Sequence, residues 1–323
     1  MRRRSRPLAA IAAVCALAII VSACGAASPW MIETQEQDAS LLSITAADST
    51  HAWAVGGGPI YFFNGVSWET QVKSLEAEPV SVSAADPSHL WACGGDGKGI
   101  IWSSDGKNWT KQLETADASM SLVSAADPSH VWAVGSNPAS STIYFFNGSS
   151  WASQYSGPFH AQDIFALDAK HVWAVAEDKS ERSSVYFFDG ASWSKQYEAP
   201  AGRFLFGISA ADPDHAWAVG SRSGKGAGPL ESLGSTFFFN GRGWAETQQT
   251  DEELHKVAAA DAKHVWAVGG LGDHGPVYFN DGKGWSKQFD AHEALFDVAA
   301  ADARHAWAVG GLGAIFVFED TPF

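Results

Sequence analysis

The sequence predicts an all-β fold, a seven-bladed β-propeller of four-stranded antiparallel blades. The string Asp-x-x-His-x-Trp occurs seven times, at intervals of 38, 41, 41, 44, 49 and 41 residues, and a period of about 40 residues indicates a repeat architecture. Each repeat holds four short apolar or aromatic runs between turn residues, and none sustains a helical period. Four strands per repeat are typical of a propeller blade, so seven repeats imply seven blades.

The order of elements within a repeat is constant. An apolar strand ends in Ala-Ala-Asp or a close variant, and a short turn leads to His-x-Trp-Ala-Val. A variable loop, an aromatic strand such as Ile143-Tyr144-Phe145-Phe146, an Asn-Gly or Asp-Gly turn and finally Trp-x-x-Gln follow. The turn residues and the β-branched and aromatic runs therefore predict four strands in sequence.

The tryptophans predict how the ring closes. Each repeat has an inner Trp, and all but the last also have an outer one: Trp53, Trp91, Trp132, Trp173, Trp217, Trp266 and Trp307 are inner, and Trp68, Trp109, Trp151, Trp193, Trp244 and Trp285 are outer. Trp30, followed by Gln35, precedes the first repeat. We expect this segment to supply the fourth strand of the last blade, because closure removes exposed edge strands.

The first residues form a separate segment. Four arginines among the first six residues precede an apolar run of 14 residues, Leu8 to Val21, and then Val-Ser-Ala-Cys ending at Cys24. This resembles a bacterial lipoprotein signal. The resemblance implies a cleaved signal peptide at 1–23, a lipid on Cys24, a lipidated linker at 24–29 and a propeller at 30–323. A membrane-spanning helix is the alternative, but a bilayer core requires about 20 apolar residues.

Charge and cysteine content exclude several functions. Loss of 1–23 would remove four basic residues and no acidic one, so the formal charge would change from −15 to −19. Such an acidic chain repels phosphate backbones, which argues against nucleic acid as a partner. Only Cys93 would remain inside the mature propeller, where other repeats have Val. A disulfide framework and a thiolate metal site are therefore excluded, and we expect no metal and no cofactor.

The Trp-Ala-Val-Gly strands, the aromatic strands and the (Asn/Asp)-Gly-x-x-Trp turns resemble those of the Asp-box (bacterial neuraminidase repeat) propellers and their photosystem-II-assembly-factor-like relatives. The similarity covers nearly all of residues 30–323. The best match is Ser103-Ser104-Asp105-Gly106-Lys107-Asn108-Trp109, one residue shorter than the usual box, and other repeats have Phe or Asn where Ser104 stands. The motif is a structural turn, so the resemblance implies the fold and not an activity.

The repeated acid–imidazole pairs invite a metal or acid–base interpretation. We interpret them as structural turns, because Asp86-Pro87-Ser88-His89 has the order of a type I turn. Seven identical turns around a ring also do not converge on one substrate. The pairs are Asp48 and His51, Asp86 and His89, Asp127 and His130, Asp168 and His171, Asp212 and His215, Asp261 and His264, and Asp302 and His305.

The repeats differ most in the loops after their second and fourth strands. Alternating strand direction places these loops on one face and the constant turns on the other. The longest loop runs from Ser221 to Ser235 and contains Arg222, Lys225 and Glu231. Binding residues are concentrated in variable loops on rigid scaffolds, so Arg222 and Lys225 are candidate contacts.

The first strands predict a second candidate site, at the mouth of the channel. Four residues before the terminal Asp every repeat has Ile or Val, which indicates packing. The two preceding positions break the repeat symmetry with carboxylates, an amine, an imidazole and aromatic rings: Asp163, Lys256 and Asp297, and Phe206, His255 and Phe296. These residues could converge on one ligand, or they could be solvated polar groups with no ligand. In the first case, substitution of the three charged residues should weaken binding and leave stability nearly unchanged.

These observations favour a non-enzymatic, membrane-anchored binding or assembly scaffold that acts as a monomer. It would lie on the extracytoplasmic side of a bacterial membrane, inner or outer, and bind an unknown envelope protein or glycan. One alternative is a lectin with a sugar pocket in each blade. The other alternative, suggested only by the family resemblance, is a sialidase-type hydrolase. The clustered arginines of such an enzyme would have to come from unmatched positions: Arg182, Arg203, Arg222, Arg242 and Arg304.

We predict that Cys24→Ala yields a protein that is not lipidated and is released from the membrane, because no other residue can carry the lipid thioether. Mass spectrometry of the mature N-terminus and membrane fractionation measure both effects. A wild-type protein with a free N-terminus and no acyl mass would refute the lipoprotein assignment.

Overall fold

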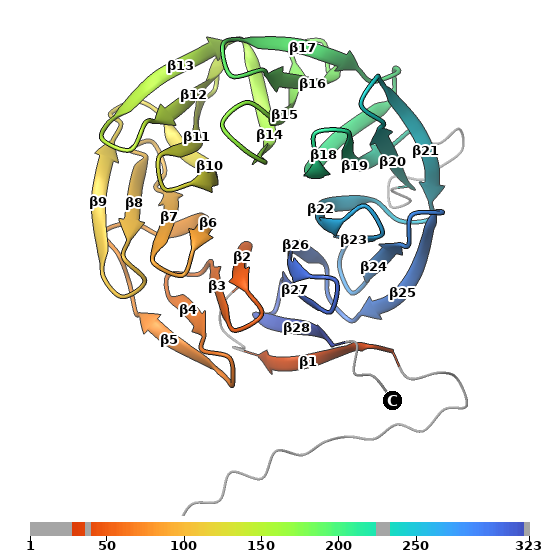
Figure 1. The fold of residues 1–323 in the computed structure, drawn as a ribbon, viewed down its shortest axis with the longest axis horizontal. Coiled ribbons are helices and arrows are strands. Elements are labelled where there is room, and N and C mark those ends of the chain that lie inside the picture. The colour runs from red at the N-terminus through yellow and green to blue at the C-terminus, as the bar shows by residue number, and fades with distance from the viewer. Residues whose placement is uncertain (1–27, 36–39, 224–232, 320–323) are drawn as a thin grey trace, which may run out of the picture.

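A computed structural model describes residues 28–35, 40–223 and 233–319. Seven four-stranded antiparallel sheets are arranged as blades around a central channel (Figure 1), which confirms the predicted seven-bladed propeller. No helix in the described part of the chain is long and apolar enough to span a membrane. The predicted signal peptide, Cys24 and Lys225 lie outside the described residues.

Each blade is ordered from the channel outward. Blade 1 consists of β2 (Ser43–Asp48), β3 (His51–Val55), β4 (Ile60–Phe63) and β5 (Trp68–Val72); blade 2 of β6 (Pro79–Asp86), β7 (His89–Gly94), β8 (Ile100–Ser104) and β9 (Trp109–Glu114); blade 3 of β10 (Ser119–Asp127), β11 (His130–Asn137), β12 (Ser140–Phe146) and β13 (Trp151–Gly157). Blade 4 consists of β14 (Phe159–Ala166), β15 (Val172–Asp178), β16 (Ser183–Phe188) and β17 (Trp193–Glu198); blade 5 of β18 (Arg203–Asp212), β19 (His215–Arg222), β20 (Leu233–Phe239) and β21 (Trp244–Thr250). Blade 6 consists of β22 (Leu254–Asp261), β23 (His264–Gly269), β24 (Gly275–Asn280) and β25 (Trp285–Ala291); blade 7 of β26 (Leu295–Asp302), β27 (His305–Gly310), β28 (Ala314–Glu319) and β1 (Trp30–Gln35).

Blade 7 joins the two ends of the described chain, as the tryptophan pattern predicts. Trp30 on β1 pairs with Phe318 on β28, in the same register as Trp68 with Phe63 in blade 1. Trp30 is only 3% exposed. Antiparallel pairing of β1 with β28 therefore covers the outer edge of β28 and closes the ring (Figure 1).

An outer belt of indole hydrogen bonds links successive blades. Trp109 Nε1 donates to Gln71 Oε1 of the preceding blade at 3.0 Å, and Trp193 Nε1 donates to Gln154 in the same way at 2.8 Å. At the closure, Glu33 of β1 takes the place of the glutamine and accepts from Trp68 Nε1 at 2.9 Å. The strand from the N-terminal side thus takes part in this belt, which is interrupted at Trp151 and Trp285, whose Nε1 atoms have no hydrogen-bond partner among the described residues.

The hydrophobic core is divided into seven clusters. Each cluster joins two consecutive blades: an inner Trp of one blade packs against the apolar residue four positions before the terminal Asp in the next. In the interface between blades 3 and 4, fully buried Trp132 packs with Ile164 and Val172. The inner tryptophans therefore stabilise the interfaces between consecutive blades, because large aromatic side chains dominate the energetics of such contacts.

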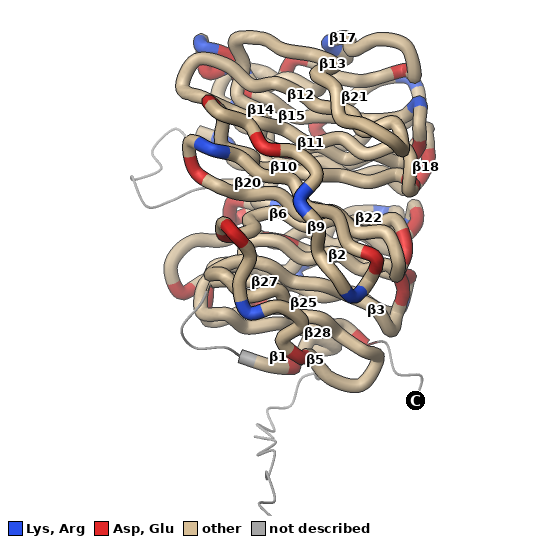
Figure 2. Tube along the Cα trace, turned by 90° about the vertical axis from the view of Figure 1, so that its left-hand side faces the viewer, with Lys and Arg blue, Asp and Glu red and all other residues tan. Residues whose placement is uncertain are grey.

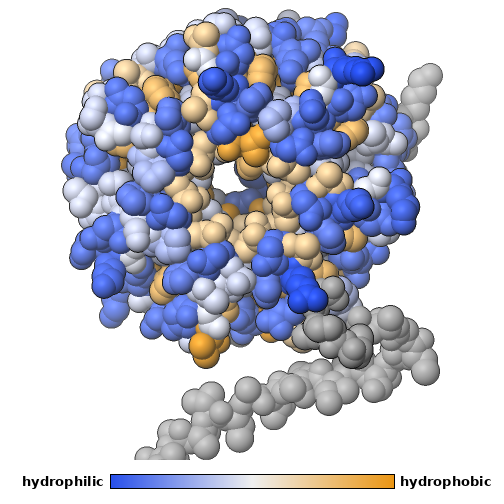
Figure 3. Space-filling view, in the orientation of Figure 1, coloured by the Kyte–Doolittle hydropathy of each residue, from blue (hydrophilic) through white to orange (hydrophobic). Residues whose placement is uncertain are grey.

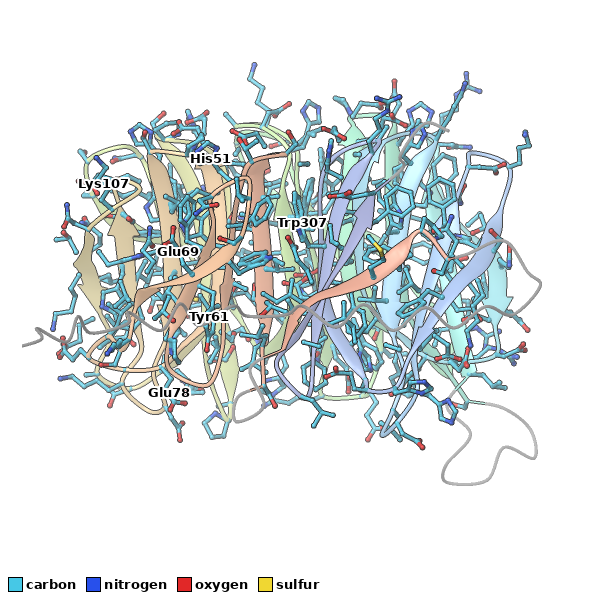
Figure 4. The ribbon with its side chains drawn as sticks, turned by 90° about the horizontal axis from the view of Figure 1, so that it is seen from below. His51, Tyr61, Glu69, Glu78, Lys107 and Trp307 are labelled. Carbon is cyan, nitrogen blue, oxygen red and sulfur yellow. The ribbon has the colours of Figure 1, made fainter. Side chains whose placement is uncertain are left out.

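The two faces of the ring carry different connections. We call the face with the Asp-x-x-His and (Asn/Asp)-Gly turns the turn face, and the opposite face the loop face. Figure 4 shows His51 and Lys107 on the turn face and Glu78 on the loop face. The two turns of one blade pack together. Gly148 has a φ of +89°, and any larger residue there would place its Cβ only 3.0 Å from Ser129 Cβ in the neighbouring turn. Short, packed turns therefore fix the turn face.

We expect Trp30→Ala to lower the free energy of unfolding by about 3–5 kcal/mol, because it removes a buried indole from the closing strand. Met31→Ala is the matched control on the same strand. Its side chain is 55% exposed, so a change within about 0.5 kcal/mol is expected. Urea unfolding measures both, and equal stability of the two variants would show that β1 does not hold the ring closed.

Candidate functional site

The inner strands enclose a channel of about 320 Å³. Its wall combines small apolar residues with hydroxyls and, from three blades, the charged groups of Asp163, Lys256 and Asp297. Figure 3 views the turn face, on which His51 and Lys107 lie (Figure 4), and shows the channel opening on that face surrounded by apolar residues.

A β-bulge shapes the loop-face mouth of this channel. In β18, Leu205 pairs with Gly220 and Gly207 pairs with Val219, so Phe206 is left out of the ladder. The inner strands of blades 2 to 7 all skip the residue six positions before the terminal Asp: Val80, Ser121, Gln162, Phe206, His255 and Phe296. A bulge re-aims its side chain and is frequent beside functional sites. In blades 2 to 7 the side chains at the mouth therefore project from the same β-bulge.

The bulged residues of blades 5 to 7 form a continuous aromatic row. The ring centroids of Phe206 and His255 are 6.4 Å apart, and those of His255 and Phe296 are 6.5 Å apart. In blade 1 the corresponding residue is Leu42, which is 39% exposed. We call Phe206, His255, Phe296 and Leu42 the mouth arc. The sequence pattern singled out all of these residues except Leu42, whose exposure on the mouth side the sequence did not reveal.

The two carboxylates expected at the mouth lie deeper and connect blades. Asp163 and Asp297 are 6% and 8% exposed. Asp163 Oδ2 accepts the Ile208 N–H at 2.9 Å, and Asp297 Oδ2 accepts the Ile44 N–H at 2.9 Å. In blade 2, Ser81 Oγ likewise accepts a hydrogen bond from the Val123 N–H of the next blade at 3.1 Å.

Lys256 crosses the channel instead of bonding to the next blade. Its Nζ lies 2.5 Å from Asp163 Oδ1, two blades away. Burial acts to lower the pKa of Lys256, but the charges of Asp163 and Asp297 outweigh this and raise the pKa above its ordinary value. Burial raises the pKa of Asp297. Blade 5, which lies between the blades of Lys256 and Asp163, has Gly207 at the equivalent position. A side chain there would place its Cβ 2.8 Å from Lys256 Cα, so only glycine lets the inner strands of blades 5 and 6 come this close.

This geometry corrects one expectation from the sequence. Substitution of Asp163, Lys256 or Asp297 was expected to leave stability nearly unchanged. The two carboxylates instead satisfy buried backbone N–H groups of neighbouring blades, and unsatisfied buried groups destabilise a fold. Sequence spacing could not show this, because each bond joins residues at least 45 positions apart.

The seven acid–imidazole pairs are hydrogen-bonded turns, one per blade. His130 Nδ1 lies 2.8 Å from Asp127 Oδ2, and Asp127 Oδ1 accepts the Ser129 N–H at 2.7 Å. Partial burial acts to raise the pKa of Asp127, but the bonds from Ser129 and His130 outweigh it and lower the pKa. Among the described residues, no group of three or more His, Cys, Asp or Glu could hold a metal ion.

Among the described arginines, Arg182 lies in blade 4, whereas Arg203 and Arg222 are neighbours in blade 5. Arg182 Nη1 pairs with Glu198 at 2.9 Å in blade 4, and Arg203 Nε pairs with Glu246 at 3.0 Å in blade 5. Arg222 ends β19 beside Arg203. In the edge-on view of Figure 2, acidic and basic positions are interspersed over the described residues on the side shown. Arg182 and Arg203 are thus already paired with carboxylates of the protein itself.

A crevice on the turn face between blades 2 and 3 was not expected. In five blades a Phe packs on the inner Trp with ring centroids 5.0–5.3 Å apart. In blade 2 Ser103 stands opposite Trp91 instead. A crevice of about 630 Å³ opens there, lined by Trp91, Asn108, Gln112 and several hydroxyls. Alignment of the aromatic strands could have revealed it, since Ser103 alone of these positions is polar.

No family model and no curated protein matches this chain. Solved structures do match. YCF48 from Cyanidioschyzon merolae is 16% identical with a TM-score of 0.65, and the match covers 91% of this chain and 99% of that one. YCF48 bound to D1 peptide is 16% identical with a TM-score of 0.68, covering 91% and 98%. A catalytically inactive virginiamycin B lyase from Staphylococcus aureus with quinupristin is 10% identical with a TM-score of 0.70, covering 90% and 99%. These likenesses show a propeller fold that other proteins use for binding and for catalysis alike.

We predict that Asp163→Ala lowers the free energy of unfolding by about 3–5 kcal/mol, because it orphans the Ile208 N–H and leaves Lys256 charged without its partner. The double variant Asp163→Ser with Lys256→Met should recover most of this loss, since blade 2 already uses Ser81 at the equivalent position.

Chemical unfolding measures both variants. Asp273→Ala is the control, because the Asp273 side chain is 88% exposed and a change within about 0.5 kcal/mol is expected. An Asp163→Ala variant as stable as this control would show that the charged group is not structural.

Proposed function

We propose that this protein is a non-enzymatic, membrane-anchored extracytoplasmic scaffold that holds a segment of a partner protein at the loop-face mouth of its channel. The observation that carries the proposal is the mouth arc. Six blades share the same bulge. Blades 3 and 4 have the polar Ser121 and Gln162 there, whereas blades 5, 6, 7 and 1 have the four residues of the mouth arc. A structural repeat requires the bulge but not this asymmetry.

The chemistry of the arc favours a polypeptide partner. Phe206, His255 and Phe296 offer a row of half-buried rings, and His255 is fixed by Leu295 O at 3.0 Å and Glu253 Oε1 at 3.2 Å. Exposed aromatic groups on a rigid base are typical anchors for protein partners. The structure of YCF48 bound to D1 peptide supports the proposal as an example of a similar propeller that binds a peptide.

The absence of catalysis is also part of the proposal. The channel carboxylates are engaged by backbone N–H groups and Lys256. The seven imidazoles of the Asp-x-x-His turns are distributed one per blade, and Arg182 and Arg203 are paired with glutamates. None of these arrangements places a nucleophile, a base and an orienting group together, as a hydrolase requires.

Membrane anchoring is proposed from the sequence alone. The arginine-rich start, the short apolar run and the Val-Ser-Ala-Cys ending at Cys24 support it. A lipid on Cys24 would place the propeller in the cell envelope, outside the cytoplasm.

Glycan binding is the second candidate function, favoured by the turn-face crevice of blade 2. Trp91 offers an apolar ring, and Asn108, Gln112 and the neighbouring hydroxyls offer hydrogen bonds, a combination that suits a sugar. Ser103→Phe would restore the phenyl group found in sister blades and close the crevice. Loss of glycan binding in this variant would support the second candidate.

The first candidate can be tested by photo-crosslinking in intact cells. Replacement of Phe206 or Phe296 by p-benzoylphenylalanine should yield a crosslinked partner protein, because the probe preserves the ring at the mouth. The same probe at Val66, which lies on the turn face and is 86% exposed, is the control.

Affinity for the identified partner should then fall at least tenfold in the Phe206→Ser and Phe296→Ser variants, while Val66→Ser binds normally. Crosslinks that form from Val66 and not from the mouth would overturn the proposed binding face.

A further inference from the structure

A second cavity adjoins the mouth arc on the loop face. It has a volume of about 570 Å³ and lies between the loops of blades 6 and 7, with Ser40 from the chain before blade 1 at its edge. His255 and Phe296 belong to both the mouth arc and the wall of this cavity. We call it the loop pocket, and a segment held at the mouth arc would reach it directly.

The loops that form the pocket are bonded to one another. Ala294 N donates to Gly272 O at 3.1 Å, and Gly311 N donates to Ala294 O at 3.1 Å. Leu41 N donates to Gly310 O at 3.0 Å and ties in the chain before β2. The pocket is therefore preformed, which reduces the entropy lost on binding.

The pocket wall contains a carboxylate that is nearly removed from water. Glu293 is only 5% exposed, and its Oε2 accepts the Leu312 N–H. A carboxylate offers about four acceptor positions on two oxygens, and a buried charge is normally paired. Glu293 has no Lys or Arg partner among the residues that line the pocket. It therefore has capacity to accept hydrogen bonds from a cation.

One part of the remaining wall suits an alkyl chain, beside the polar His255, His292 and Asp273 that also line the pocket. Leu271 and Leu312 line the pocket and are 54% and 53% exposed, and Phe296 closes the side next to the mouth. Lys and Arg side chains bury their methylene stems on apolar surface and keep the charged head on polar groups. Leucines around a single buried carboxylate match this division.

We propose that the loop pocket binds the side chain of a Lys or Arg residue of the partner segment, with its stem against Leu271 and Leu312 and its cation on Glu293. This inference rests on the proposed function, because it supplies the chemical class of the segment held at the mouth arc. The acidic chain, with a formal charge of −15 before any processing, also attracts basic segments.

The test uses small cations that reproduce the two side chains. Saturation-transfer NMR with the full-length protein in detergent measures dissociation constants for n-hexylammonium and n-butylguanidinium, and n-hexanol serves as the neutral probe of equal length. Both cations should bind at least tenfold more tightly than hexanol. The comparison of the two cations distinguishes Lys from Arg as the preferred residue.

Glu293→Gln removes the charge and keeps an acceptor for the Leu312 N–H. It should weaken binding of both cations at least tenfold and leave hexanol unchanged. Glu78→Gln, on the same face (Figure 4), is the matched control and should bind as the wild type does. Equal cation affinity in the two variants, or equal affinity of the wild type for hexanol and hexylammonium, would overturn the proposal.

A second variant avoids the buried position. Leu271→Lys places a tethered cation at the rim from a residue that is 54% exposed, so it should fold normally and block the cations. Unimpaired cation binding in this variant would also overturn the proposal. If the cations do not bind as expected but crosslinking at Phe206 and Phe296 succeeds, only the pocket proposal is wrong. If the cations bind as expected but no crosslink forms, only the proposed function is wrong.

Discussion

The packing of each inner Trp against the next blade is the contact on which the rest of the structure depends. A single four-stranded blade cannot bury both of its faces. Each of the seven hydrophobic clusters is formed by residues of two neighbouring blades. The ring is therefore stable only when closed, and β1 closes it through Trp30 and Phe318. Channel, turns and loops keep their positions because these interfaces fix the angle between blades.

The repeated features of the fold, namely the blades and their strands, were predictable from the sequence. Spacing and turn residues predicted the blades, and the unmatched Trp30 predicted the closing strand, because both depend on local chemistry and on counting. The pairing of Lys256 with Asp163 was not predictable in this way, since it joins blades separated by Gly207 across the curvature of the ring. The bulges were hidden for a related reason: a skipped residue is visible only when both partner strands are known.

Repetition also separates structural from functional chemistry. Asp163 at the channel wall accepts a backbone hydrogen bond from the next blade, as Ser81 does two blades away. An unusual residue type therefore does not by itself mark a site. The mouth arc and the loop pocket differ, because apolar side chains there remain exposed: Leu42, Leu271 and Leu312 are 39%, 54% and 53% exposed. Exposure combined with broken symmetry is thus the better criterion for function in this ring.

The direction of β1 determines how the molecule could stand on a bilayer. Trp30 pairs with Phe318 near the turn-face end of β28, and Gln35 pairs with Ala314 near the loop-face end. A chain that leads to Trp30 therefore enters from the turn face at the rim of blade 7. Residues 24–29, at roughly 3.5 Å each, reach about 20 Å. A lipid at Cys24 would be a short tether that holds this face near the membrane, and the loop-face opening would then be directed away from the bilayer.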